Sequence, residues 1–371
     1  MKIRAFSALM LTTTAAYADV PNVVTDIPAV HSLVSQVMGD LGSPKLLMKQ
    51  GSSPHGYSMR PSEARALQEA DMVVWIGEDL TPWLESSIEN LAPEAESLEL
   101  LHAHGTEVLN FRETPIFAGD DHHDDHDDHD EHKDEHHDDH DDHEEHADEG
   151  HGHDDHKDEH HDDHDDHDDH KDEHGHDDHD EEGHDEHAEE GHHDEHGHDH
   201  DGADPHAWLN PHNAATWVGE IAEHLAELDP ENAATYEANA ATAVGELEAL
   251  EGALAAQLAP YSGAKFIVFH DAYQYFEARF GLSAAGAIAL GDASDPGPAR
   301  IAAVRDLVLN ADAQCVLSEP LARGGLVQTV AAGTDVRVVT VDPAGTGMTQ
   351  GPQLYLELLR ALSSALKECM P

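Results

Sequence analysis

The sequence predicts an α/β protein of two lobes, each a mainly parallel sheet flanked by helices, joined by one long rigid helix. Its 371 residues are enough for two domains of ordinary size. Short apolar runs alternate with helical patterns on both sides of a highly charged segment at 120–200. Residues 230–258 are rich in Ala and Glu and have high helix propensity throughout.

Strands and helices alternate from the start of the first lobe, which we place at 19–229. We expect a further helix directly after the charged segment, at 213–228. Such alternation is typical of a parallel sheet covered on both faces. Before the charged segment, strands are expected at 20–25, 45–49 and 72–76, and helices at 27–38 and 61–69.

The linking helix is expected over 230–258, and its roughly 28 residues would span about 40 Å. A long surface helix with no linking role is the alternative interpretation. The second lobe, placed at 259–371, resumes the alternation. Its strands are expected at 265–269, 315–317 and 336–341, and its helices at 272–280, 300–310 and 353–367.

Residues 1–18 have the pattern of a secretory signal peptide. Lys2 and Arg4 form a short positive region, 5–16 is apolar, and Ala-Tyr-Ala at 16–18 is a small-x-small cleavage site. A membrane anchor is the alternative, but the apolar stretch is shorter than the about 20 residues needed to cross a bilayer. We therefore expect export, with cleavage after Ala18.

The formal net charge of −61 limits the partners of this chain. Nucleic acid and anionic membranes would be repelled, so cations are the natural partners. Residues 120–200 hold 28 of the 36 histidines and 42 acidic residues against three lysines, a net charge of −39. With almost nothing apolar to bury, this insertion is predicted to be disordered.

Export also determines how the two cysteines are interpreted. Outside the cytoplasm a pair of thiols is normally oxidised, so we expect a disulfide between Cys315 and Cys369. It would join the last helix to an internal strand. Two free buried cysteines are the alternative.

Three histidines outside the insertion occupy positions suited to a shared site. His55 and His270 each follow a predicted strand and precede a helix, where side chains of a parallel sheet project into a crevice. His206 lies in a turn-rich segment where the chain re-enters the fold. Three imidazoles and one oxygen satisfy tetrahedral Zn²⁺, so we expect the three histidines to converge on one cleft and bind a metal there.

The fourth ligand is less well defined by the pattern. Asp342 follows a predicted strand and is the candidate, with a water molecule as the substitute. Any one of these histidines taken alone is more simply a hydrogen-bonded turn residue. Three of them in an exported chain with a histidine-rich insertion favour a metal.

Two further classes of protein remain open from the residues alone. An exported zinc hydrolase would also use three histidines and a water, but the sequence has no HExxH helix and no evident general base beside them. We therefore expect no enzymatic activity. A secreted zinc buffer protein is the second class, and a protein for the uptake of Mn²⁺ or Ni²⁺ would be a closer variant of the zinc interpretation.

Three segments resemble the zinc-specific substrate-binding proteins of bacterial ABC importers. They are GSSPHGYSMRPSEARAL (51–67), DPHAWLNP (204–211) and FHDAYQYF (269–276). The resemblance covers nearly the whole mature chain, including the charged insertion, and it implies two lobes bridged by a rigid helix. It also implies that His55, His206 and His270 hold the transported Zn²⁺ in the interlobe cleft.

The resemblance further implies a periplasmic protein that delivers zinc to a membrane permease with its cytoplasmic ATPase, with a periplasmic zinc chaperone as a further partner. We expect a monomer. The manganese branch of these proteins has a glutamate in place of the third histidine, so His270 favours zinc. Some zinc-branch members have a glutamate before the first histidine, where this chain has Pro54, which leaves the fourth ligand open.

The insertion is expected to supply weak, exchangeable accessory zinc sites. Its alternative is a solvated acidic loop with incidental metal affinity. Because imidazole must lose its proton to bind metal, zinc affinity is expected to fall as the pH drops below about 6.5. The accessory histidines proposed are His122, His123, His126, His129, His192, His193, His196, His198 and His200.

Overall fold

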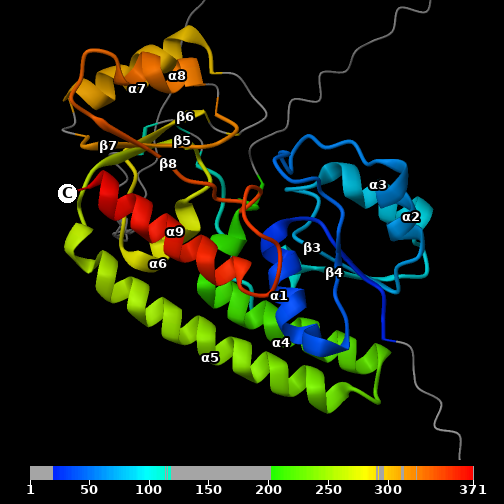
Figure 1. The fold of residues 1–371 in the computed structure, drawn as a ribbon. Helices are drawn as coiled ribbons and strands as arrows, with labels where there is room; N and C mark the ends of the chain where they lie inside the picture. The colour runs from blue at the N-terminus through cyan, green and yellow to red at the C-terminus, as the bar shows by residue number, and fades with distance from the viewer. Residues whose placement is uncertain are drawn as a thin grey trace, which may run out of the picture. The chain divides into compact units, whose positions relative to one another are not determined.

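Two four-stranded parallel sheets organise the chain in a computed structural model (Figure 1). The structure describes residues 20–112, 114, 116–117, 202–289, 291, 296–310, 313–322 and 324–370. The predicted signal peptide and the insertion at 120–200 lie outside these residues, as do all nine accessory histidines.

The first sheet has the strand order β2-β1-β3-β4. Along β3, alternate residues face opposite ways, so Met72 and Val74 join one buried cluster with α1 while Val73 and Trp75 join another with α2 and α3. Helices therefore cover both faces of the sheet. The strands are β1 (Val23–Thr25), β2 (Lys45–Leu46), β3 (Met72–Trp75) and β4 (Glu96–Glu99), and the helices are α1 (Pro28–Met38), α2 (Pro61–Gln68) and α3 (Pro82–Leu91).

The second sheet repeats this plan with the order β6-β5-β7-β8. Phe266 and Val268 of β5 face the cluster that contains α6 and α9, whereas Ile267 and Phe269 face α7 and α8. The strands are β5 (Phe266–His270), β6 (Gly286–Ala289), β7 (Cys315–Ser318) and β8 (Arg337–Thr340). The helices are α6 (Gln274–Phe280), α7 (Pro298–Asn310), α8 (Gly324–Ala331) and α9 (Leu354–Cys369).

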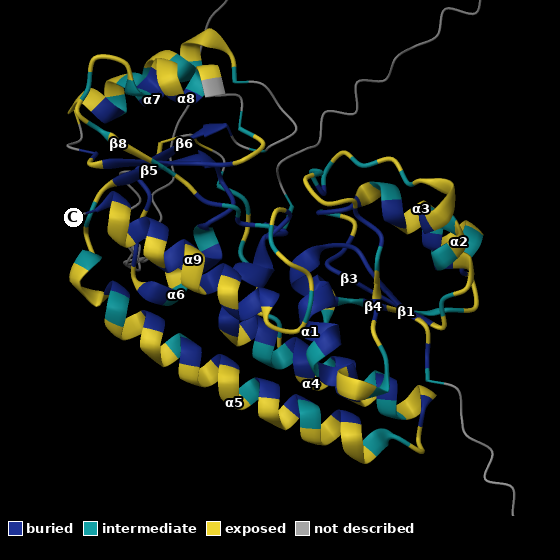
Figure 2. Ribbon diagram, viewed as in Figure 1, coloured by how far each residue is buried: buried dark blue, intermediate teal, exposed yellow. Residues whose placement is uncertain are grey.

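Two long helices, α4 (Pro211–Leu228) and α5 (Ala233–Leu258), pack against each other beneath the sheets (Figure 1). Helix α5 contacts α1 and also α9, and its buried face is lined by leucines such as Leu247 and Leu254 (Figure 2). One continuous hydrophobic cluster includes residues from both sheets and from α5. A role for α5 as a rigid link between lobes stays a prediction.

Several local features follow from the sequence. Proline occupies the first position of α1, α2, α3 and α4, where its missing N–H costs no hydrogen bond. Cys315 of β7 and Cys369 of α9 form the expected disulfide, with a Cα–Cα distance of 5.2 Å. Among the described helices, none is long and apolar enough to cross a membrane. Short 3₁₀ turns complete the fold, namely η1 (Gly39–Leu41), η2 (Leu100–His102), η3 (Ala207–Leu209) and η4 (Ala259–Tyr261).

Candidate metal centre

His270 is the last residue of β5, and a carboxylate just after the neighbouring strand β7 fixes its ring. Its Nδ1 atom lies 2.7 Å from each carboxylate oxygen of Glu319, which directly follows β7. The hydroxyl of Tyr273 donates to the same carboxylate at 2.9 Å. Burial raises the pKa of Tyr273 well above its usual range, with Glu319 adding to the shift, so Tyr273 remains a hydrogen-bond donor.

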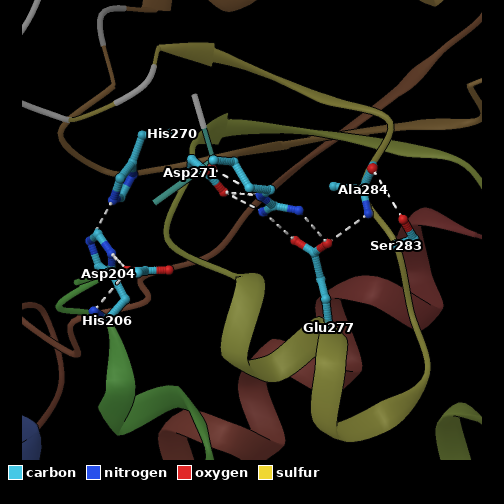
Figure 3. Close-up of polar contacts among 8 residues, drawn as sticks. Asp204, His206, His270, Asp271, Glu277, Ser283 and Ala284 are labelled. Carbon is cyan, nitrogen blue, oxygen red and sulfur yellow. Dashed lines mark hydrogen bonds and ion pairs between the residues drawn. The ribbon is translucent and has the colours of Figure 1, made fainter. Parts of the chain in front are cut away.

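His206 is fixed in the same manner by a carboxylate two residues earlier in the chain (Figure 3). Its Nδ1 lies 2.7 Å from Oδ1 of Asp204, which also accepts a hydrogen bond from the His206 backbone N–H at 3.0 Å. Asp204 is only 1% exposed. Burial raises its pKa to about 7, although the His206 N–H and the positive charge of Arg112 act in the opposite direction.

The two histidines meet through their other ring nitrogens, Nε2 to Nε2, at 3.4 Å. With Nδ1 donating to a carboxylate, each neutral imidazole carries its lone pair on Nε2, an assignment made from these contacts. Two nitrogens bound to one tetrahedral Zn²⁺ at 2.0–2.1 Å are roughly 3.3–3.4 Å apart. The spacing therefore matches two ligands of a single zinc ion.

His55 lies beside this pair, on the loop between β2 and α2. Its ring centroid is 5.6 Å from that of His206. The loop is held where the backbone oxygen of Pro54 accepts a hydrogen bond from the indole of Trp83 at 2.8 Å. In the described part of the chain, no three His, Cys, Asp or Glu side chains already stand at metal-binding spacing. The structure thus pairs His206 with His270 and places His55 next to them.

All four predicted metal ligands line one cavity of about 310 Å³. Asp342 reaches it from the turn after β8. Its Oδ2 accepts hydrogen bonds from the backbone of Gly347 at 2.7 Å and from the hydroxyl of Thr346 at 3.2 Å. The rest of the lining is mixed, with Glu319 and Thr346 among its polar residues and Trp208, Phe269 and Leu326 among its apolar ones.

The carboxylate next to His270 in the sequence takes no part in this cavity. Asp271 faces away from it and accepts two hydrogen bonds of 3.0 Å from Nε of Arg112. Burial raises the pKa of Asp271 to about 6, while Arg112 lowers it. Asp271 therefore forms an ion pair with Arg112 and does not lie where a general base of a hydrolase would be needed.

Sequence reasoning did not assign roles to Asp204 or Glu319. The Asp-x-His spacing of Asp204 and His206 was a usable signal, since an aspartate readily bonds a side chain two residues ahead in a turn. Glu319 became recognisable only once β5 and β7 were known to be neighbours.

Comparisons with known proteins identify the family. The family described as zinc-uptake complex component A, periplasmic (ZnuA), matches residues 23–369. The high-affinity zinc uptake system protein ZnuA of Paracoccus denitrificans is 40% identical over 96% of this chain and 93% of its own length. The protein of the same name from Brucella abortus (strain 2308) is 40% identical over 94% of this chain and 91% of its own length.

Solved structures share the fold at lower identity. A crystal structure of ZnuA superposes with a TM-score of 0.64 at 19% identity, covering 95% of this chain and all of that one. AdcAII from Streptococcus pneumoniae gives a TM-score of 0.63 at 19% identity, covering 94% of this chain and 98% of that one. The resemblance seen in the sequence is thereby confirmed: the chain belongs to the ZnuA family of periplasmic zinc-uptake components.

Proposed function

We propose that this protein captures Zn²⁺ in the periplasm and delivers it to the membrane permease of an ABC-type zinc importer, which a cytoplasmic ATPase drives. His55, His206 and His270 bind the ion through imidazole nitrogens. Asp342 or a water molecule supplies the fourth ligand. The zinc-uptake names of the relatives support this cargo.

The 3.4 Å separation of the His206 and His270 Nε2 atoms is the observation that carries the proposal. Two lone pairs that face each other at this distance repel, whereas a cation between them attracts both. The carboxylates behind each ring hold both lone pairs in this direction. The His55 loop closes on the ion to complete the site.

A site with three nitrogen donors favours Zn²⁺ over Mn²⁺, which is better served by carboxylates. Ni²⁺ also accepts imidazole ligands, so a competition experiment between Zn²⁺ and Ni²⁺ is needed to tell which ion is the cargo. Release needs only a small rearrangement of the lobes when the protein docks on the permease. Residues 120–200 supply weak accessory sites and concentrate cations by their charge of −39.

Calorimetric zinc titration of four proteins tests the proposal. They are the full chain, the chain without residues 120–200, the triple variant of His55, His206 and His270 to Ala, and His212→Ala as the control. His212 lies six residues after His206 on α4, with 46% of its side chain exposed, and does not line the cavity.

We expect one tight zinc equivalent in the full chain, the shortened chain and the control. The triple variant should lose the tight equivalent and keep the weak ones. The chain without residues 120–200 should instead lose the weak equivalents. If the tight equivalent disappears with residues 120–200 and survives in the triple variant, the capture site is wrongly placed. Competition with Mn²⁺ and Ni²⁺ on the shortened chain then tests the cargo.

A further inference from the structure

We infer that Arg112 is a positioning residue for the zinc site, because it fastens the segment at 109–112, which precedes the insertion, to the turn that follows His270. This inference rests on the proposed function. Arg112 lines no part of the metal cavity, and it lies 159 residues along the chain from its main partner, Asp271.

Arg112 makes paired contacts with two buried carboxylates. Its Nε lies 3.0 Å from both oxygens of Asp271, and Nη2 also bonds that carboxylate. Its Nη1 and Nη2 donate to Glu277 at 3.0 and 3.1 Å. The side chains of Asp271 and Glu277 are 2% and 5% exposed, and that of Arg112 is 18% exposed. Such forked contacts fix the direction of a guanidinium as well as its position.

The stacked ring of Phe117 and the turn after α6 complete the surroundings of Arg112. The guanidinium carbon lies 3.6 Å from the centroid of Phe117, whose backbone N–H donates to Ala285 at 2.9 Å. Glu277 also accepts a hydrogen bond from the backbone of Ala284 at 2.9 Å (Figure 3). Arg112 is thus anchored to the turn after β5 and to α6, and through Phe117 it also lies next to the start of β6.

The same segment is joined by its backbone to the turn that carries His206. Asn110 and Ala203 form an antiparallel bridge, and Asp204 donates its backbone N–H to Leu109 at 2.8 Å. The hydroxyl of Tyr275 connects both sides, since it accepts from the Leu109 N–H at 2.9 Å and donates to the Asp204 carbonyl at 2.7 Å.

Residues 109–112 therefore hold both halves of the histidine pair. Leu109 and Asn110 support Asp204 and through it His206, while Arg112 supports Asp271, the residue after His270. The 3.4 Å distance between the two Nε2 atoms depends on this short connector. A ligand pair held in place before the ion arrives binds more tightly than one that must be ordered on binding.

The test compares Arg112→Met with Arg279→Met in the full chain. Arg279 also pairs with a carboxylate, with 2.9 Å between its Nε and Glu251, but that pair joins α6 to α5 away from the histidines. Zinc affinity at one equivalent is measured by competition with a chromophoric chelator, and Co²⁺ replaces zinc for absorption spectra.

We expect Arg112→Met to weaken zinc binding roughly 10- to 100-fold, as loss of outer-sphere support does at other metal sites, and to alter the Co²⁺ spectrum. Arg279→Met should stay close to the wild-type value in both measurements. Equal weakening in both variants, or an unchanged affinity and spectrum in folded Arg112→Met, would overturn the inference.

Removing Arg112 leaves two buried carboxylates without their cation, and the Met variant can fail to fold for that reason. In that case Arg112→Lys is the deciding variant, since lysine keeps the positive charge but cannot make the paired contacts of a guanidinium. We expect an intermediate affinity, and a wild-type value contradicts positioning by the guanidinium. If the wild-type protein itself has no tight zinc equivalent, the proposed function fails instead, which separates the two outcomes.

Discussion

Each of the paired histidines has a buried carboxylate behind its Nδ1, Asp204 for His206 and Glu319 for His270. The carboxylate fixes the tautomer and the ring orientation, and it makes Nε2 a stronger donor to a cation. At the scale of single residues, the metal binding that we propose therefore depends also on side chains that are not themselves predicted ligands.

Replacing Glu319 with Gln tests this dependence. The amide keeps the size of the side chain but removes its charge, so we expect zinc affinity to fall roughly 10- to 100-fold while the fold is retained. Glu96→Gln is the control, because Glu96 contacts His224 in a similar pair outside the cavity. Chelator competition should show wild-type affinity for Glu96→Gln, and a matching loss in both variants would contradict the role given to Glu319.

The prediction of the three histidines rests on strand ends and turns, which are recognisable from local pattern. The residues that support the histidines were harder to predict from the sequence, because their contacts depend on which segments become neighbours in the fold. Glu319 reaches His270 across 49 residues, and Arg112 reaches Asp271 across 159 residues that include the insertion. No pattern within a short window contains such a pair.

At the scale of elements, the central strands were predictable, and of the edge strands only β8, expected at 336–341, lies close to its predicted range. β1, β3, β5 and β7 lie inside their sheets and are buried on both faces, which gives continuous apolar runs. Among the other edge strands, β4 and β6 were missed and β2 was predicted too long. β4 reads Glu-Ser-Leu-Glu with only Leu98 buried, β6 consists of Gly, Ala and Ile, and β2 ends at Leu46 where 45–49 was expected.

Two helices were also missed. The segment that forms α3 contains several polar residues. Only two of its residues, Leu84 and Ile88, are buried. The segment that forms α8 begins with two glycines, which have low helix propensity, and packs chiefly through Val327 and Val330. Both helices are stabilised by packing against a sheet, which a local pattern does not reveal.

The disulfide joins two elements whose stability it should govern. Cys315 and Cys369 are 54 residues apart, and closing a loop of that length stabilises the folded state by about 4 kcal/mol in the chain-entropy account. Replacing both with Ala should lower the free energy of unfolding by roughly 2–4 kcal/mol. Denaturant unfolding of the zinc-free protein measures this, and reduction of the wild type should reproduce it. An unchanged transition midpoint would contradict the estimate.

At the scale of the whole molecule, the described residues bring the predicted ligands together from distant segments. His55 follows the second strand of one sheet, His270 ends a strand of the other, and His206 precedes α4. One hydrophobic cluster contains residues of both sheets, of α4 and of α5. A continuous core of this kind holds the bases of the loops that carry the three histidines in fixed relation to one another.

Zinc-edge anomalous diffraction from crystals of the full chain grown with one equivalent of Zn²⁺ is the most direct measurement of the shared site. We predict one strong peak in the 310 Å³ cavity, about 2.0–2.1 Å from a ring nitrogen of each of His55, His206 and His270. An empty cavity, with the anomalous signal confined to residues 120–200, would contradict the account.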